Sequence, residues 1–461
     1  MSSVFCEISK YLMMILFAVY TYECFTVLMS HNQTPERQQK IFFNQNILMF
    51  MIHLDAFLVI FDQTDDVTVL LFYLAQVVFF IVVLTSYRFL YEKSSRLVVN
   101  NMCMLMMIGF IILTRLSYTK AIRQFAIAVT STVFCLLIPL MIRKLKFIRN
   151  MVWLYGVLGI LLLLYVFITA TTSYGAKLSI SILGYAFQPS EFVKIIFVFF
   201  VAGMFIRSTE LPNVIITTGF AMLHVLILVM SKDLGSALIF FIVYLVMMFV
   251  ATHKILYFVS LLGVGSVAAY LAYLIFSHVQ TRVIAWLDPV SVIDTAGYQI
   301  CQSLFAIGTG GWFGSGLYQG MPTKIPVVEE DFVFSAISEE MGGIFAICLI
   351  LVCMSVFLMF LNIAMQMKNR FYKLVALGLG TCYGIQVFIM IGGVIKFIPS
   401  TGVTLPFISY GGSSILSTTI IFAIIQGFYL FREDEGEINV SKEKKETSNK
   451  RRSSRSRSKD N

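Results

Sequence analysis

Apolar runs long enough to cross a membrane recur from one end of this chain to the other, and they limit its fold more than any other feature. A hydrocarbon core of about 30 Å is crossed by a helix of roughly 20 apolar residues. Only 13% of the 461 residues are charged, whereas a soluble domain has about twice that share. We therefore predict an all-α polytopic membrane protein.

Thirteen candidate spans follow from these runs, each located to within a few residues. An odd number of spans places the two termini on opposite sides of the membrane. Because cytoplasmic loops are enriched in Lys and Arg, the distribution of cations favours a cytoplasmic C-terminus and an extracellular N-terminus. The candidate spans are 9–30, 45–62, 67–90, 98–115, 121–142, 151–170, 189–206, 213–230, 235–252, 254–276, 332–363, 370–394 and 411–431.

On this topology the outer loops have fewer cations than the cytoplasmic loops, although Arg115, Lys120 and Arg123 run against the rule. A large share of the net charge of +9 lies in 442–459, within the tail 432–461. A solvated, disordered cytoplasmic tail near anionic lipid explains this better than nucleic-acid binding, so we expect no nucleic-acid partner. The eight cysteines and five histidines form no zinc-type spacing.

The longest loop, 277–330, has about 54 residues and lies outside on this topology. It contains the string GTGGWFGSGLYQG, whose glycines allow tight backbone turns. Repeated glycine is also common in flexible filler, so the string alone does not decide between the two. The segments 171–188 and 395–410 lie on the same side.

Ionisable residues at membrane depth are costly and mark either a functional site or a structural pair. Glu191 and Lys194 are three residues apart at the start of a helix and share one face. Asp233 opens another helix, where a carboxylate also suits the positive helix end. A structural ion pair and a simple helix cap remain open as explanations for these residues.

Asp331 precedes the string FVFSAISEEMGG at the outer mouth of a long helix. Glu339 and Glu340 follow roughly 12 Å deeper, at the helical rise per residue. Three acids around one outer helix, facing cations from other helices, indicate a reaction centre or an ion path. Asp55 is also intramembrane, and the sequence offers it no partner, so it is structural or unexplained.

These segments together resemble the shape–elongation–division–sporulation (SEDS) family, the RodA, FtsW and SpoVE group. The resemblance covers about 98–431 and implies a ten-helix core, with three extra N-terminal helices in this chain. We divide the chain into an accessory bundle, 1–95, a core, 96–431, and the tail. The motifs occur in family order: FQPSEFVK (187–194), DLGSAL (233–238), GYQICQSLFAIGTGGWFGSGLYQG (297–320), DFVFSAISEEMG (331–342) and IPSTGVTLPFISYGGSS (398–414).

Two departures from the family pattern concern substrate contacts. The family's common His-Thr before the catalytic Asp is here Glu329-Glu330, and its Arg-Arg-Trp after Asn-Gly-Ala is reduced to Gly175-Ala176-Lys177. The Asp itself is retained, as Asp331.

The resemblance implies a peptidoglycan glycosyltransferase that polymerises lipid II into β-1,4 glycan and releases undecaprenyl pyrophosphate. A carboxylate at a half-buried mouth can have its pKa raised toward the working pH of a general base, and Asp331 fits that role best. Positive charge for the pyrophosphate would come from cations or from a divalent ion, Mg²⁺ or Mn²⁺, near Asp331. The candidate substrate-binding residues are Lys194, Arg123, Lys177, Lys396, Glu191 and Asp233, with Glu339, Glu340, Gln188 and Ser413 in support.

Two other functions compete with this one, a lipid II flippase and a catalytically silent scaffold. We expect location in the bacterial cytoplasmic membrane and a class B penicillin-binding protein as the transpeptidase partner. The sequence does not distinguish elongation from division or sporulation. The N-terminal helices either serve a partner or regulation, or pack on the core and stabilise it.

Overall fold

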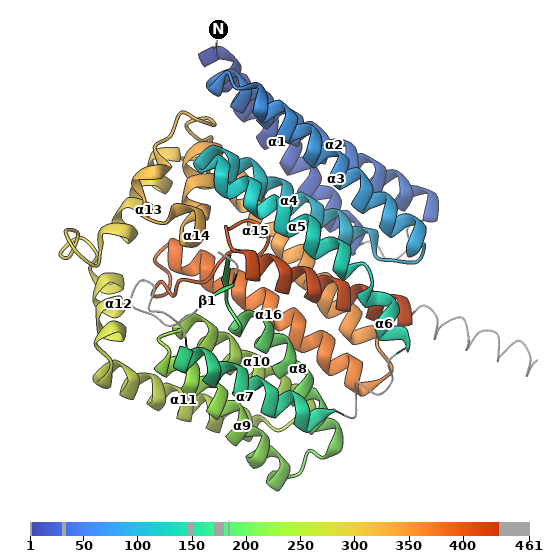
Figure 1. The fold of residues 1–461 in the computed structure, drawn as a ribbon, viewed down its shortest axis with the longest axis vertical. Helices are drawn as coiled ribbons and strands as arrows, with labels where there is room; N and C mark the ends of the chain where they lie inside the picture. The colour runs from blue at the N-terminus through green and yellow to red at the C-terminus, as the bar shows by residue number, and fades with distance from the viewer. Residues whose placement is uncertain (1, 30–33, 145–150, 170–178, 183–184, 433–461) are drawn as a thin grey trace, which may run out of the picture.

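The computed structural model describes residues 2–29, 34–144, 151–169, 179–182 and 185–432, and nearly all regular structure within them is helical (Figure 1). Within the described residues, twelve helices are long and apolar enough to cross a membrane. A further helix, α8 (Ser190–Arg207), matches the seventh predicted span but includes three charged residues. The predicted all-α membrane fold is confirmed, and the chain is a multi-pass membrane protein.

The first seven helices are α1 (Ser2–Met29), α2 (Pro35–Thr64), α3 (Val67–Leu90), α4 (Arg96–Leu116), α5 (Tyr118–Cys135), α6 (Ile138–Lys144) and α7 (Val152–Thr169). A short antiparallel hairpin, β1 (Ile180–Ile182) and β2 (Tyr185–Phe187), leads into α8. Then come α9 (Leu211–Met230), α10 (Leu234–Thr252), α11 (Ile255–Ile275), α12 (Ser277–Leu287), α13 (Tyr298–Gly310), the 3₁₀ turn η2 (Pro322–Lys324), α14 (Val328–Asp331), α15 (Val333–Gln366) and α16 (Arg370–Val394). A final helix spans Gly412–Arg432.

Several helices extend beyond the apolar runs that predicted them. α2 begins at Pro35 rather than at residue 45, with proline at its start and Glu36 in its first turn, both suited to a helix N-terminus. The loop 277–330 is also more ordered than the sequence indicated, since it contains α12, α13 and α14. Hydrophobic periodicity detects the spanning part of a helix better than its polar ends.

The two ends of the bundle differ. α12, α13 and α14 gather at one end, beside the start of α15, and we call this the Asp331 end (left in Figure 1). α6 and the last turn of the final helix lie at the opposite end. α4 lies in the interior, with every side chain from Leu97 to Thr114 buried.

α15 is broken at Gly342, whose φ of 89° and ψ of 165° are not helical. The glycine-rich string of the loop 277–330 crosses this break. The N–H groups of Ser315 and Gly316 donate to the carbonyl oxygens of Glu339 and Glu340, each at 2.9 Å. Backbone groups freed by a broken helix must find partners in an apolar interior, so this loop is a structural part of α15.

Close packing explains the glycines of that string. The N–H of Gly343 donates back to the carbonyl oxygen of Gly311 at 2.8 Å. A Cβ at Gly314 would lie 2.4 Å from the carbonyl oxygen of Glu340, closer than carbon and oxygen atoms can approach. The string is therefore not flexible filler, because larger residues would separate the loop from the break.

The three N-terminal helices pack against the core, along α4 and α15 (blue in Figure 1). The rings of Phe17 and Phe345 are 4.4 Å apart between centroids, and the Tyr20 hydroxyl donates to Asn101 Oδ1 at 2.9 Å. Asp55, for which the sequence offered no partner, accepts a hydrogen bond from Ser9 at 2.7 Å and joins α2 to α1. The functional boundary near residue 95 stays a prediction.

Candidate functional site

Asp331 is the last residue of α14, a single turn that directly precedes α15. Burial raises the pKa of its carboxyl to about 6, the charge of Glu330 adds to the shift, and Arg282 opposes it. No hydrogen bond or ion pair joins the Asp331 carboxylate to another residue of the described part of the chain. Both of its oxygens therefore remain available to a proton donor from outside the chain.

Arg282 on α12 supplies positive charge beside Asp331. Its Nη1 donates to the carbonyl oxygen of Ser400 at 3.1 Å, which holds the guanidinium against the loop between α16 and the final helix. Burial lowers the pKa of Arg282, whereas the charges of Asp331 and Asp233 raise it. The same loop approaches Asp331 at Gly402, where an added Cβ would lie 3.5 Å from Oδ2 and φ is +73°.

Lys120 on α5 approaches α14 from another direction. Its ammonium forms ion pairs with Glu329 and, at 3.7 Å, with Glu330. It also lies 5.2 Å from the ring centroid of Tyr410. The two glutamates that replace the family's His-Thr pair thus have a cation of their own, which fixes α14 next to α5.

Asp233 caps α10, since its Oδ1 accepts from the N–H of Ser236 at 3.0 Å. A helix cap was one of the two explanations that the sequence left open for this residue. Its other oxygen accepts hydrogen bonds from Ser190 at 3.2 Å and from Gln188 at 3.4 Å. The backbone N–H of Gln188 in turn donates to the Ser413 hydroxyl at 2.9 Å. Gln188, Asp233 and Ser413 therefore form one connected group from three elements.

Glu191 and Lys194 form the expected ion pair, 2.6 Å apart, with both side chains largely buried. The Ser417 hydroxyl donates to Glu191 at 2.5 Å, and Lys194 donates to the side-chain carbonyl of Gln386 at 2.7 Å. Through Ser417 and Gln386 the pair joins α8 to α16 and the final helix. Each charged group has at least two partners, as burial of charge requires.

The two deeper acids differ from Asp331. Glu340 is fully buried and paired with Arg115 of α4 at 2.9 Å, and Arg115 also packs 4.1 Å from the ring centroid of Tyr318. Glu339 Oε1 accepts from the N–H of Met321 at 2.9 Å. These acids hold the glycine-rich loop at the break in α15.

Two of the predicted substrate-binding cations, Arg123 and Lys396, lie apart from the acids around Asp331. Arg123 is exposed on α5, and Lys396 lies at the end of α16, where its carbonyl oxygen accepts from Trp286 at 3.2 Å. Neither makes a hydrogen bond or ion pair with the described acids around Asp331. Lys177 lies outside the described residues.

Sequence reasoning did not assign Arg282, Lys120, Arg115, Gln386 or Ser417 to the site. A signal existed for two of them, since Arg115 and Lys120 fell on the outer side of the predicted topology, against the positive-inside rule. Arg282 lies in the loop 277–330 that the sequence singled out by its length, but nothing local distinguished it there. Gln386 and Ser417 are neutral residues within apolar helices and gave no signal.

The described residues group no three His, Cys, Asp or Glu side chains in a way that could hold a metal ion. Around Asp331 the acids are accompanied by Arg282 and Lys120, which oppose the binding of a cation. This donor set does not fit a resident divalent ion, and no step of the reaction is derived through one.

The comparisons with known proteins agree with this arrangement. Residues 95–432 match the family of FtsW, RodA and SpoVE, described as "Cell cycle protein". The "Peptidoglycan glycosyltransferase RodA" of Mycobacterium tuberculosis (strain ATCC 25618 / H37Rv) is 37% identical over 267 residues, 54% of this chain and 57% of that protein. The "Probable peptidoglycan glycosyltransferase FtsW" of Geobacter sp. (strain M18) is 33% identical over 275 residues, 57% of this chain and 73% of that protein.

The match with the mycobacterial RodA proteins spans little more than half of their length. Among solved structures, one described as "Structural coordination of polymerization and crosslinking by a peptidoglycan synthase complex" matches with a TM-score of 0.63 and 21% identity, over 74% of this chain and 98% of that one. RodA of Thermus thermophilus matches with a TM-score of 0.57 and 20% identity, over 74% and 97%. The sequence motifs, the fold and the family match agree that this chain belongs to the FtsW/RodA/SpoVE (SEDS) family.

Proposed function

We propose that this protein is a peptidoglycan glycosyltransferase, which joins lipid II into β-1,4-linked glycan strands and releases undecaprenyl pyrophosphate. The observation that carries the proposal is the Asp331 carboxylate, half-buried beside Arg282 and bonded to none of the described residues. The names of the bacterial RodA and FtsW relatives support this activity.

Asp331 acts as the general base in this proposal. It takes the proton from the 4-hydroxyl of the acceptor sugar while that oxygen attacks the anomeric carbon of the donor. The bond from that carbon to the pyrophosphate breaks on the opposite side, so the linkage inverts in a single displacement. With a pKa of about 6, Asp331 is ionised at neutral pH and still basic enough to accept the proton.

Arg282 is the cation best placed to stabilise charge at Asp331, because it is half-buried, its charge acts on that carboxylate, and it is held on Ser400. We assign the Glu191, Lys194 and Gln386 group to substrate binding, as a second polar group inside the bundle. Electrostatic stabilisation by fixed charges is strong where water is excluded. The divalent ion expected from the sequence stays a prediction, tested by adding a chelator and then Mg²⁺ or Mn²⁺ to the polymerisation assay.

The proposal places the Asp331 end at the outer face of the bacterial cytoplasmic membrane, with the N-terminus outside and the C-terminus in the cytoplasm. The cations Arg37, Lys40, Lys93 and Arg96 then lie at the cytoplasmic end, as the positive-inside rule requires. A class B penicillin-binding protein that crosslinks the new strand is the proposed partner.

Polymerisation of lipid II by the purified protein in detergent or in a lipid bilayer tests the function. Glycan strands made without any other enzyme support the proposal. Movement of lipid II across a bilayer without polymer would favour a flippase. If the purified protein makes no polymer alone, and polymer appears only after a second enzyme with its own glycosyltransferase domain is added, a scaffold is favoured instead.

A further inference from the structure

A cavity of about 310 Å³ lies beside α13, at the Asp331 end of the bundle. The end of the glycine-rich loop, the turn η2 and Glu339 of α15 form part of it, and we call it the α13 cavity. Asp331 and Arg282 are not among its described lining residues, so the proposed chemistry leaves it without a role. One wall is a single face of α13, formed at helical spacing by Gln302, Phe305, Ala306 and Thr309.

Two polar side chains of the α13 cavity have no partner in the described part of the chain. The Gln302 amide and the Lys324 ammonium form no hydrogen bond or ion pair there. Gln319 has a contact of 3.9 Å to a cysteine sulfur of α1. The Thr309 hydroxyl donates to the carbonyl oxygen of Phe305 at 2.8 Å, and its own oxygen remains an acceptor. The walls therefore present both donors and acceptors to a ligand.

Glu339 adds a buried carboxylate to the wall. The residue is 5% exposed, and its Oε1 accepts from the N–H of Met321 at 2.9 Å. Its Oε2 is buried and accepts no hydrogen bond from the described residues. A buried oxygen without a donor is unfavourable, so this atom favours a ligand that donates. Because Oε2 is covered, the donor reaches it only with a small movement of the lining side chains.

Charge and size select the class of ligand. Lys324 is the one cation and Glu339 the one acid among the described lining residues, so the cavity favours neither an anion nor a cation. Phe305 is 54% exposed and offers a flat apolar face beside these groups. A volume of about 310 Å³ is at the small end for ligand sites. A neutral sugar ring fits this set of groups, since each of its hydroxyls both donates and accepts.

We propose that the α13 cavity binds an amino-sugar ring of the glycan, an inference that rests on the proposed function. The ring would stack on Phe305, and its hydroxyls would bond to Gln302 and Glu339. Its acetamido oxygen would accept from Lys324. Glu339 follows Asp331 by eight residues, roughly 12 Å at the helical rise, so sugars at the two places can belong to one short chain. That chain is either the incoming lipid II or the growing strand.

Binding is tested without polymerisation. The probe is N,N′,N″,N‴-tetraacetylchitotetraose, a soluble β-1,4-linked amino-sugar chain, added to the purified full-length protein in detergent. Maltotetraose, an α-linked glucose chain, is the control sugar. We expect saturation-transfer NMR signals from the amino-sugar chain and none from maltotetraose. Equal signals from both sugars, or no signal from either, overturn the proposal.

Variants locate the binding. Phe305→Ala combined with Lys324→Gln should weaken binding of the probe about 10-fold, because one ring contact and one hydrogen bond are lost. The matched control combines Phe89→Ala with Lys368→Gln, which replaces an exposed phenylalanine and an exposed lysine that do not line the cavity. Equal losses in the two double variants would overturn the assignment.

A steric variant covers the case in which the first double variant does not fold. Thr309→Trp places a large side chain in the α13 cavity while Phe305 and Lys324 remain, and it should reduce binding of the probe at least as much. Undiminished binding in a folded Thr309→Trp protein would overturn the site.

Polymerisation by the same variants identifies the source of the sugar. A raised KM for lipid II with kcat unchanged indicates the incoming substrate, since uniform binding is lost. Shorter strands at an unchanged initial rate indicate the growing strand. If a variant that no longer binds the probe keeps the native KM and strand length, glycan does not occupy the cavity. A native chain that binds the probe and makes no polymer refutes the glycosyltransferase and leaves the sugar site standing.

Discussion

Two carboxylates close to the start of α15 each lie beside one arginine, yet they are held in opposite ways. Glu340 is fully buried and bonded to Arg115 at 2.9 Å, and Arg115 is further fixed by Tyr318. Asp331 has no bonded partner among the described residues, and Arg282 donates to the carbonyl oxygen of Ser400.

This difference separates a structural acid from a chemical one. Breaking a buried pair such as Glu340–Arg115 leaves a charge without compensation and costs about 3–5 kcal/mol. An acid without a fixed partner can exchange its proton at little structural cost. The three acids that the sequence grouped around one helix therefore have different roles, which mutation can tell apart.

The largest effect on activity is expected for Asp331→Asn. Because the amide cannot accept the proton, polymerisation by the purified protein should fall by about 100-fold or more. Removing the half-buried carboxylate of Asp331 should not lower Tm at neutral pH. The matched control is Asp294→Asn, an exposed acid of the same loop, which should retain activity. Near-normal polymer from Asp331→Asn would remove Asp331 from the catalytic role.

A second test concerns the one ion pair that we assign to substrate binding, Glu191–Lys194. Glu191→Ala and Lys194→Ala should each impair polymerisation, and the double variant should lose less than the sum. Charges 2.6 Å apart belong to one network, for which coupling energies of about 0.5–3 kcal/mol are usual. Strictly additive losses in the double-mutant cycle would mean that the two residues act separately.

The third test uses the pH dependence of polymerisation to identify Asp331 as the base. The pKa of Asp331 is raised to about 6, so the base is lost by protonation and polymerisation should fall as pH drops through about 6. Removing the cation in Arg282→Gln should move this midpoint upward, and removing a nearby negative charge in Glu330→Gln should move it downward. A midpoint that neither change moves would separate the pH dependence from Asp331.

The same shift has a consequence for stability. A carboxyl whose pKa is higher in the folded state binds its proton more tightly there, so ionised Asp331 costs stability above about pH 6. That cost is absent below its unfolded pKa and develops as pH rises between the two values. The Tm difference between Asp331→Asn and the native chain should therefore be larger at neutral than at acidic pH.

The fourth test changes the structural pair. Arg115→Gln should lower Tm more than Arg282→Gln does, because it leaves Glu340 buried and uncompensated. The acid limb of activity should keep its midpoint, since Arg115 does not contribute to the pKa of Asp331. Thermal unfolding and a pH profile measured on both variants are sufficient. A shifted midpoint in Arg115→Gln would show that the two acids are coupled.

The sequence predicted the spans and the acids better than it predicted the partners of those acids. Helices and intramembrane charges are local features, whereas the Arg115–Glu340 pair joins residues 225 positions apart. Charge type alone also could not rank the cations, so Arg123 and Lys396 were selected and Arg282 was not. The glycine string alone could not show whether it forms tight turns or flexible filler, because its role depends on the distant break at Gly342.

The smallest effect on chemistry is expected when the N-terminal helices are removed. Their contacts reach the loop near Glu340: Lys10 donates to the carbonyl oxygen of Gly314 at 3.3 Å, in the glycine-rich loop that bonds to the backbone of Glu340. None of the described contacts of Asp331 or Arg282 involves residues 1–95.

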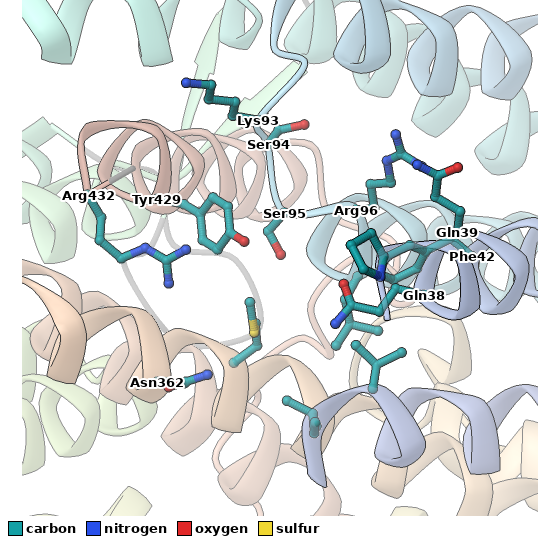
Figure 2. A pocket seen from close by; sticks show the side chains of 15 residues that line it. Gln38, Gln39, Phe42, Lys93, Ser94, Ser95, Arg96, Asn362, Tyr429 and Arg432 are labelled. Carbon is teal, nitrogen blue, oxygen red and sulfur yellow. The ribbon is translucent and has the colours of Figure 1, made fainter. Parts of the chain in front are cut away.

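A chain that begins at Ser94 should therefore insert and polymerise lipid II. Its Tm should be lower, because the contacts of Phe17 and Tyr20 with α15 and α4 are lost. It should also lose the cavity of about 420 Å³ at the end of the bundle opposite Asp331, two walls of which are α1 and α2 (Figure 2). The full-length protein in the same detergent is the control for folding. If the shortened chain is folded and monodisperse and yet makes no polymer, the catalytic core extends into the N-terminal helices and the boundary near residue 95 is wrong.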